Sequence, residues 1–199
     1  KTNAYFLEED YSIREIIDEK IHAAGVAAID IERVGQAINV FIRAARPGLV
    51  IGRGGKGIED LKNALNKAIL ALRRTNKKSL NLRLNLNIEE IKRTEVSAQV
   101  VAEQIAADIE KRMPYRNLMK RQIEAIKQNR EVQGVKVRLS GRLNGSEIAR
   151  NDWLAWGKMP LQTLRSQIDY GQATSFNSYG TVGVKIWIYK GEIFDKENK

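Results

Sequence analysis

The chain of 199 residues has no cysteine and a single histidine, His22. A chain without cysteine cannot use thiol catalysis, a disulfide framework or a thiolate zinc site, and it suits a reducing, cytoplasmic location. The nucleophile and base pairs of hydrolases would all have to use His22, which lies near the end of a predicted helix. We therefore predict a protein that is not an enzyme, holds no metal or other cofactor and has no small-molecule substrate.

Long apolar stretches are also missing, and acidic residues are in the minority. No apolar run approaches the roughly 20 residues that a membrane span requires, so no membrane partner is expected. Lys and Arg total 34 against 24 Asp and Glu, which gives a formal net charge of +10. An excess of this size indicates a polyanionic partner, and nucleic acid is the first choice.

The most distinctive stretch is a basic, glycine-rich loop that follows residues 47–51. It contains Gly52, Arg53, Gly54, Gly55 and Lys56. Glycine lets the backbone approach a ligand closely and adopt positive φ. The helix predicted to follow points its first free N–H groups at the loop, which favours an anion there. Together with the two cations, this pattern predicts a phosphate site.

Three phosphate-binding motifs compete for this loop. A P-loop requires a glycine five positions before Gly55 and a Ser or Thr after Lys56, and neither is present. The dinucleotide-binding spacing is met, but Arg73 and Arg74 stand about where an acidic ribose ligand should follow. The remaining motif is the Gly-x-x-Gly loop of a KH module, which clamps single-stranded nucleic acid by its backbone. Alone, this short motif is weak, and a structural turn is the simpler interpretation.

The periodicity of the first half places the loop in a fold. We predict a helix that starts at an N-cap at Asp10 or Ser12, the latter with a capping box to Glu15, and stops at Gly25. We also predict strands over residues 26–34 and 37–44, a short helical turn over 47–51, a helix over 58–78 and a strand over 80–88. This α-β-β-α-α-β order is that of the type II KH fold. We predict a KH domain with an N-terminal extension over residues 1–92.

We predict a second, different α+β domain over residues 93–199. The boundary is placed in the segment 89–94 because this segment is charged and shows no clear helical or strand periodicity. We predict helices over 96–109 and after Pro114, a short helix over 145–150, and strands over 135–141, 166–170 and 182–189. In the first and last of these strands, basic and other polar residues alternate with apolar ones. The predicted fold class is thus α+β: a type II KH domain, then two helices and a small, mostly antiparallel sheet.

Basic residues recur on the second helix of this half. Arg116, Lys120, Lys127 and Arg130 fall within an arc of about 80° at ~100° per residue. A solvated helix face is the ordinary interpretation of such an arc, but the overall charge favours a face turned toward nucleic acid.

Aromatic residues also concentrate in the second half. They could stack on bases, although core and protein-contact roles are more common for them. The residues concerned are Trp153, Trp156, Tyr170, Tyr179, Trp187 and Tyr189.

Four stretches resemble the bacterial-type family of small-subunit ribosomal protein three. They are residues 45–55 (ARPGLVIGRGG), 139–150 (LSGRLNGSEIAR), 160–165 (PLQTLR) and 179–188 (YGTVGVKIWI). The stretches span both halves and keep the spacing of the family, and the last three are more specific than the glycine loop.

The resemblance implies a structural constituent of the small ribosomal subunit. Such a protein binds small-subunit rRNA in the head, lines the mRNA entry channel and contributes to mRNA binding and unwinding. The implied neighbours are the tenth and fourteenth small-subunit proteins, and a basic segment is implied ahead of Lys1. A free regulatory KH protein that binds single-stranded RNA is the alternative, since it needs the same loop and charge; the C-terminal resemblance favours the ribosomal reading.

We predict RNA contacts in three groups, on the loop, on the basic helix and on the rest of the second half. Asn117 stands where the family commonly has a second arginine, so Arg121 is expected to contribute in its place. For Arg142 and Arg150 the alternative is a salt bridge within the C-terminal domain. The predicted contacts are Gly52, Arg53, Gly54, Gly55, Lys56, Arg116, Lys120, Arg121, Lys127, Arg142, Arg150, Lys158 and Arg165.

Overall fold

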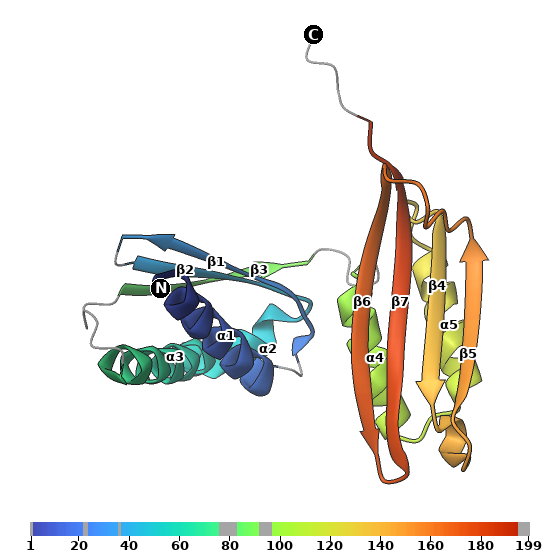
Figure 1. The fold of residues 1–199 in the computed structure, drawn as a ribbon, viewed down its shortest axis with the longest axis horizontal. Coiled ribbons are helices and arrows are strands. Elements are labelled where there is room, and N and C mark those ends of the chain that lie inside the picture. Colours follow the sequence, from blue (N-terminus) through green and yellow to red (C-terminus); the bar gives the residue numbers. More distant parts are fainter. Residues whose placement is uncertain (1, 22–23, 36, 76–82, 92–96, 195–199) are drawn as a thin grey trace. The chain divides into compact units, whose positions relative to one another are not determined.

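The computed structural model describes residues 2–21, 24–35, 37–75, 83–91 and 97–194. The chain divides into two compact units, Lys1–Lys92 and Arg93–Lys199 (Figure 1). Each unit has its own hydrophobic core. Within the described part of the chain, no helix is long and apolar enough to cross a membrane.

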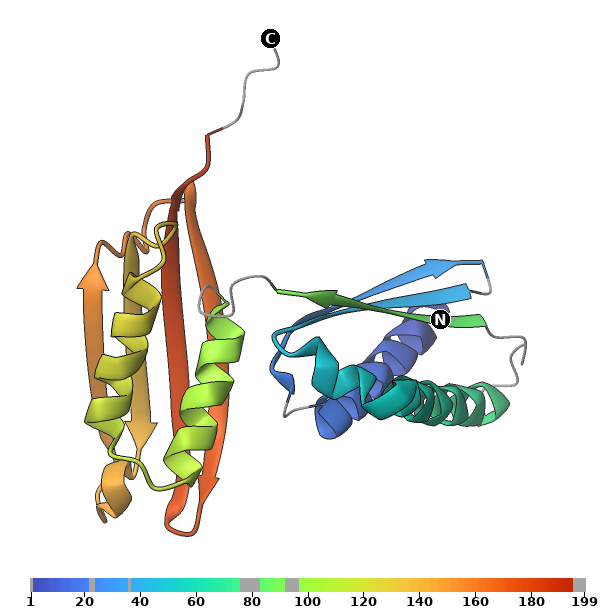
Figure 2. The same ribbon diagram turned by 180° about the vertical axis from the view of Figure 1, so that it is seen from behind.

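The N-terminal unit is a mixed sheet with helices on one face (Figures 1 and 2). Its elements are α1 (Thr2–Ile21), β1 (Val26–Val34), β2 (Ala37–Ala44), α2 (Pro47–Ile51), α3 (Lys56–Thr75) and β3 (Arg83–Glu90). The described strands have the order β1-β2-β3. β1 and β2 are antiparallel, whereas β2 and β3 are parallel. The α-β-β-α-α-β order predicted from the sequence is confirmed.

The core of this unit follows from the alternation in its strands. Ile38, Val40 and Ile42 of β2 point one way and are almost fully buried against the helices. Their neighbours on the opposite face include Asn39, whose side-chain oxygen accepts a hydrogen bond of 2.9 Å from Asn85 of β3. A one-residue slip in register would exchange these two faces, so the pattern specifies the pairing.

Helix α1 starts much earlier than predicted. It begins at Thr2, so the helix start predicted at Asp10 or Ser12 is wrong. Tyr5 and Glu9 of the additional turns are buried, at 8% and 0% exposed. Since a capping box is a local signal, burial of the preceding turns overrides it here.

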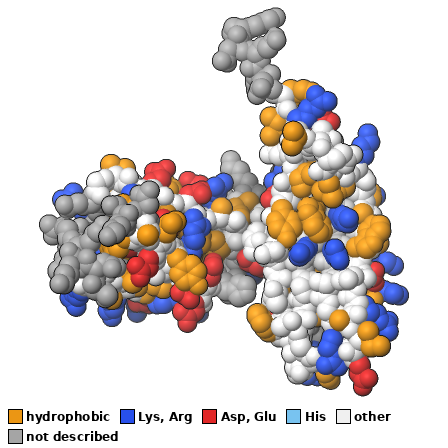
Figure 3. Space-filling model, in the orientation of Figure 1, with side chains coloured by type: hydrophobic (Ala, Val, Ile, Leu, Met, Phe, Trp, Pro, Cys, Tyr) orange, Lys and Arg blue, Asp and Glu red, His pale blue; other side chains and the backbone are white. Residues whose placement is uncertain are grey.

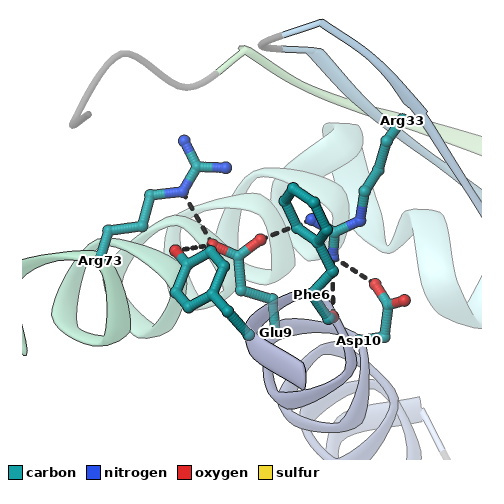
Figure 4. A network of polar contacts seen from close by, with 6 residues as sticks. Phe6, Glu9, Asp10, Arg33 and Arg73 are labelled. Atoms are coloured by element: carbon teal, nitrogen blue, oxygen red, sulfur yellow. Dashed lines mark hydrogen bonds and ion pairs between the residues drawn. The ribbon is translucent and has the colours of Figure 1, made fainter. Parts of the chain in front are cut away.

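A buried polar network fixes these first turns of α1 (Figure 4). The Glu9 carboxylate accepts hydrogen bonds from Arg73 of α3 at 2.9 Å, from Arg33 of β1 at 2.5 Å and from the Tyr5 hydroxyl. Arg33 also donates to Asp10. The network thus joins α1 to both β1 and α3.

The same contacts set the ionisation of the network. Burial opposes ionisation of Glu9, but the hydrogen bonds from Arg73, Tyr5 and Arg33 outweigh it and lower the pKa of Glu9 below its usual value. Burial and the neighbouring Glu9 carboxylate raise the pKa of Tyr5 to about 12. At neutral pH the network therefore holds a charged carboxylate and an uncharged tyrosine.

The C-terminal unit is a sheet with two helices on one face (Figure 2). Its elements are α4 (Ala98–Glu110), α5 (Tyr115–Lys127), β4 (Gly134–Gly141), β5 (Arg150–Gly157), β6 (Ser166–Asn177) and β7 (Gly180–Glu192). The described strands have the order β5-β4-β7-β6, and each neighbouring pair is antiparallel. The predicted arrangement of helices followed by a mostly antiparallel sheet is confirmed.

A close contact between helix and sheet explains one glycine of this unit. A Cβ on Gly171 of β6 would lie 2.4 Å from the carbonyl oxygen of Ala98 in α4. Real Cβ contacts are not this short, so α4 can pack on β6 at this point only because the residue is glycine.

Several predictions for the second half need correction. The short helix predicted over residues 145–150 is wrong, because a 3-10 turn covers Leu143–Gly145 and β5 begins at Arg150. Strand β5 was not predicted, and β6 extends beyond residue 170 to Asn177. Arg130 lies beyond the end of α5, so the basic arc on this helix ends at Lys127.

Some predictions fall outside the described residues. They concern His22, the helix end at residues 77–78, the strand start at residues 80–82, the domain boundary at residues 92–93 and the helix start at Val96.

Candidate nucleic-acid interface

The glycine loop is a sharp connection between α2 and α3. Gly52, Gly54 and Gly55 all have positive φ, at 70°, 65° and 80°, a conformation that favours glycine. A Cβ on Gly57, in the first turn of α3, would lie 2.4 Å from the carbonyl oxygen of Val50. The glycines therefore allow both the backbone turn and the close packing of α2 on α3.

The outer side of this loop is open and positively charged. A Cβ built on Gly54 or Gly55 meets no atom within 4 Å. Arg53 and Lys56 are exposed, and neither has an ion-pair partner within the described ranges. The start of α3 adds free N–H groups and the positive end of the helix dipole, although Glu59 in its first turn weakens the field. The loop can accept a phosphate without breaking any existing contact.

Helix α5 has one buried face and one basic face. Met119, Ile123 and Ile126 are buried in the core with residues of the sheet and α4, and Leu118 is also buried. At about 100° per residue, the basic positions 116, 120 and 127 fall within roughly 40° of each other on the exposed side. The structure thus brings three of the predicted contacts on this helix into one stripe.

The cations of α5 differ in how strongly they are held. Arg116 is 73% exposed, and its Nε lies 3.6 Å from a carboxylate oxygen of Asp152 and donates a 3.1 Å hydrogen bond to the Tyr115 hydroxyl. That hydrogen bond raises the pKa of Arg116, which stays charged. Arg121 points away from the stripe and binds Asp108 of α4 at 2.6 Å. Arg121 therefore already helps to join the two helices.

The other two cations of the stripe, Lys120 and Lys127, have no carboxylate partner among the described residues. Lys120 is exposed and has no ion pair in the part of the chain that the structure describes. Lys127 places its Nζ 5.5 Å from the centre of the Trp156 ring. Both charges therefore remain available to a polyanion.

The remaining predicted contacts do not form one site. Arg142 donates hydrogen bonds to the backbone oxygens of Ser146 at 2.8 Å and Tyr179 at 2.7 Å. It therefore braces two turns, and it makes no salt bridge to any described residue. Arg165 pairs with Glu192 at 3.0 Å.

Two of these residues, Arg150 and Lys158, have no ion-pair partner among the described residues and lie at opposite ends of the sheet. Arg150 is the first residue of β5 and pairs with Gly141 of β4 at one end of the sheet. Lys158 directly follows Gly157, which pairs with Gly134 of β4 at the other end. Both are exposed. The residues 142, 150, 158 and 165 thus mark several separate points of this unit.

Three exposed or half-buried cations of the sheet are not among the predicted RNA contacts. Lys136, Arg138 and Lys185 lie on the face of β4 and β7 opposite the helices. The signal was present in the alternation of basic and apolar residues along both strands. By itself, this alternation predicts a strand and not which of its faces stays uncovered.

Within the described ranges, no group of three or more His, Cys, Asp or Glu residues could hold a metal ion. The chemistry of the exposed loop and stripe is that of phosphate binding by Lys, Arg and backbone N–H groups.

The fold and loop together define the N-terminal unit as a KH domain. Residues 12–96 match the family described as KH domain. Residues 105–188 match the family described as Ribosomal protein S3, C-terminal domain. The two matches cover one unit each, in the order predicted.

Similarity to curated proteins extends over nearly the whole chain. A small ribosomal subunit protein uS3 from Carboxydothermus hydrogenoformans is 48% identical over 194 residues, which cover 97% of this chain and 82% of that protein. The protein of the same name from Lawsonia intracellularis is 44% identical over 99% of this chain and 87% of its own length. That from Maridesulfovibrio salexigens is 45% identical over 96% and 84%.

The chain belongs to the family of small ribosomal subunit protein uS3, of the bacterial type. This is a family of structural ribosomal proteins and not of enzymes, so the predicted family and the predicted non-enzymatic role are both confirmed.

Proposed function

We propose that this chain binds small-subunit rRNA in the head of the subunit, in the cytoplasm, and contributes to the lining of the mRNA entry channel. The observation that carries the proposal is the match to uS3 proteins over 97% of the chain, at 48% identity. The unit of residues 1–92 acts as the KH RNA-binding domain and residues 93–199 as the second ribosomal domain. The tenth and fourteenth small-subunit proteins are the proposed neighbours.

The exposed cations give this proposal its physical basis. Lys and Arg side chains that neutralise phosphates release counterions, which supplies affinity that is largely independent of sequence and falls steeply with salt. Arg53 and Lys56 in the loop and Lys120 on α5 are exposed and form no ion pair within the described residues. They can therefore bind RNA phosphates without first breaking a salt bridge. Such sites suit a protein held on folded rRNA.

The α5 stripe is the part proposed to act on mRNA. Arg116 and Lys120 are exposed side chains one helical turn apart, while the opposite side of the helix is buried. A basic edge of this kind can hold the phosphates of a strand as it leaves a duplex. Asn117 contributes no charge beside them, and Arg121 is engaged with Asp108. We therefore assign unwinding to Arg116, Lys120 and Lys127.

Translation through a stable hairpin tests this assignment. Ribosomes carrying Arg116→Ala with Lys120→Ala should pause more at a hairpin message than wild-type ribosomes, by about 3- to 10-fold if the two contacts together supply ~1 kcal/mol. They should translate an unstructured message at the wild-type rate.

A matched variant controls for the loss of two charges. Lys62 and Lys67 are exposed residues of α3, and Lys62→Ala with Lys67→Ala lowers the net charge equally. This variant should leave hairpin translation unchanged. Equal slowing on both messages by the α5 variant would contradict the proposal and would mean that α5 only holds rRNA.

A further inference from the structure

One face of the C-terminal sheet is not covered by its helices. Both α4 and α5 pack on the same side (Figure 2). Figure 3 shows hydrophobic side chains gathered with Lys and Arg side chains over the opposite, open face of this sheet. We call it the open sheet face and define it by two rows of paired residues, Tyr170, Trp187, Lys136 and Ala155, followed by Gln172, Lys185, Arg138 and Trp153.

Register and burial establish which residues point outward. Trp187 lies between Ile186 and Ile188, which are 0% exposed and belong to the core on the helix side. Because successive strand residues point to opposite faces, Trp187 and its cross-strand neighbours point away from the helices. Trp153 is 60% exposed and Tyr170 is 45% exposed. Both are large aromatic rings that lie open to solvent.

Cations are interleaved with the rings. The Nζ of Lys136 lies 5.4 Å from the centre of the Trp153 ring and 5.7 Å from that of Trp187. The rings of Tyr170 and Trp187 are 5.5 Å apart. The two rows contain Lys136, Arg138 and Lys185, and neither row contains Asp or Glu. The charge of the face is therefore uniformly positive.

A hollow continues the face beyond the second row. Ser140, Thr174 and Gly183 line it together with Arg150, and its volume is about 450 Å³. A Cβ on Gly183 would lie 3.1 Å from Oγ of Ser140, so glycine at this position keeps the hollow free of side-chain atoms. Its polar lining suits the sugar and phosphate of a nucleotide whose base lies on the neighbouring rings.

We propose that the open sheet face is a second RNA-binding surface of this chain, separate from the glycine loop, on which unpaired bases stack on Trp153, Trp187 and Tyr170. Lys136, Arg138, Lys185 and Arg150 hold the adjoining phosphates. This inference extends the proposed RNA-binding function and rests on it.

The charge of the face favours RNA over a protein partner. Aromatic rings beside Lys and Arg are the combination that binds single-stranded nucleic acid, because every base has a π-face and every nucleotide a phosphate. A protein docked on these rings would have to cover three cations that have no carboxylate neighbour in the two rows, at a desolvation cost. Docking of a protein is the competing hypothesis, and the experiment is designed to distinguish it from RNA binding.

The test measures binding of the full chain to an unstructured RNA of about 12 nucleotides and to an abasic RNA of the same length. Trp153→Leu with Tyr170→Leu should weaken binding of the base-containing RNA about 10-fold and leave the abasic RNA unchanged, because stacking needs a base. Quenching of tryptophan fluorescence by RNA should fall with it. Arg138→Gln with Lys185→Gln keeps the rings but removes two cations, so it should weaken the binding of both the base-containing and the abasic RNA.

Controls separate this surface from the loop and from unfolding. Leu164→Ala changes a fully exposed apolar residue of the same unit and should bind as wild type. Thermal unfolding confirms that each variant is folded. The ring variant is also made with Gly54→Asp, which introduces a carboxylate into the loop, and the two losses should multiply.

Each outcome decides one of the two proposals. If the ring variant binds RNA as wild type while Gly54→Asp weakens binding, the open sheet face is not an RNA surface and the loop remains one. If only the ring variant has an effect, the loop proposal fails and the sheet proposal stands. If the ring variant binds RNA normally but no longer joins small subunits, the face docks a protein, and the inference is overturned.

Discussion

At the scale of single residues, the N-terminal unit depends on a carboxylate that no apolar pattern marks. Glu9 is 0% exposed, and its carboxylate accepts hydrogen bonds from Arg33 and Arg73. Each partner comes from a different part of the chain, residue 33 on β1 and residue 73 on α3. Sequence periodicity could not reveal this, because the contacts are long-range and the residue types are those of an ordinary exposed helix face.

Glu9→Gln should destabilise the unit substantially. The substitution keeps the shape of the side chain but removes the buried charge that Arg33 and Arg73 share as a hydrogen-bond acceptor, which costs about 3 kcal/mol of unfolding free energy. Urea unfolding of the purified wild-type and variant chains measures this loss of unfolding free energy. Asp30→Asn is the matched control, since its pair with Arg43 is 56% and 48% exposed and should cost less than about 1 kcal/mol. Equal losses in the two variants would contradict a special role for the buried network.

The raised pKa of Tyr5 leads us to expect that the unfolding free energy falls in alkaline solution. This pKa is raised from 10.0 to about 12 in the folded chain. Below pH 10 both the folded and the unfolded state keep the proton, so the stabilisation is complete. Between pH 10 and 12 the unfolded state loses its proton first, and the unfolding free energy falls by roughly 2 to 3 kcal/mol. Tyr5→Phe removes this contribution, and an unchanged pH slope in that variant would contradict it.

At the scale of elements, the sequence predicted strands and helices wherever one face is apolar and the other polar. Strands β1 and β2 have the predicted bounds, and α3 and α4 have the predicted periodicity. Strand β5 was missed because Trp153 points outward while Leu154 and Trp156 pack on the core, so both faces carry apolar residues. The early start of α1 was missed because burial of Tyr5 and Glu9 depends on tertiary contacts.

The candidate site was predictable only in part, for the same reason. The glycine loop and the stripe of Arg116, Lys120 and Lys127 follow from local spacing. The hydrogen bond of Arg142 to the backbone oxygen of Tyr179 depends on a residue distant in sequence, and the ion pair of Arg121 with Asp108 depends on another helix. Which cations are free for a ligand can be known only once their partners are placed.

The helix–loop–helix of α2, the glycine loop and α3 makes a specific prediction for Gly54. Gly54→Asp should weaken single-stranded RNA binding about 10-fold, because the new carboxylate stands beside the phosphate that Arg53 and Lys56 attract. Gly54→Asn is the matched control, since Asn has nearly the same shape and tolerates positive φ but carries no charge. Fluorescence anisotropy in low salt measures both. Similar affinity of the Asp and Asn variants would exclude the loop from the site.

At the scale of the whole molecule, an excess of ten positive charges is spread over two units with different basic surfaces. The N-terminal unit offers a loop, and the C-terminal unit offers a helix stripe and an open sheet face. Several weak, salt-dependent contacts on one chain give a strong and long-lived attachment when all are engaged together. This is the property expected of a structural constituent that remains on rRNA.

Sedimentation of a native cell lysate through a sucrose gradient is the most direct test of this account. The lysate is run in moderately high salt with magnesium, and the fractions are probed for the chain. We predict that it travels one-to-one with the small subunit after the salt wash, because its many phosphate contacts act together. If it stays at the top of the gradient, the chain is not a constituent of the small subunit, and a free RNA-binding role would replace the one proposed.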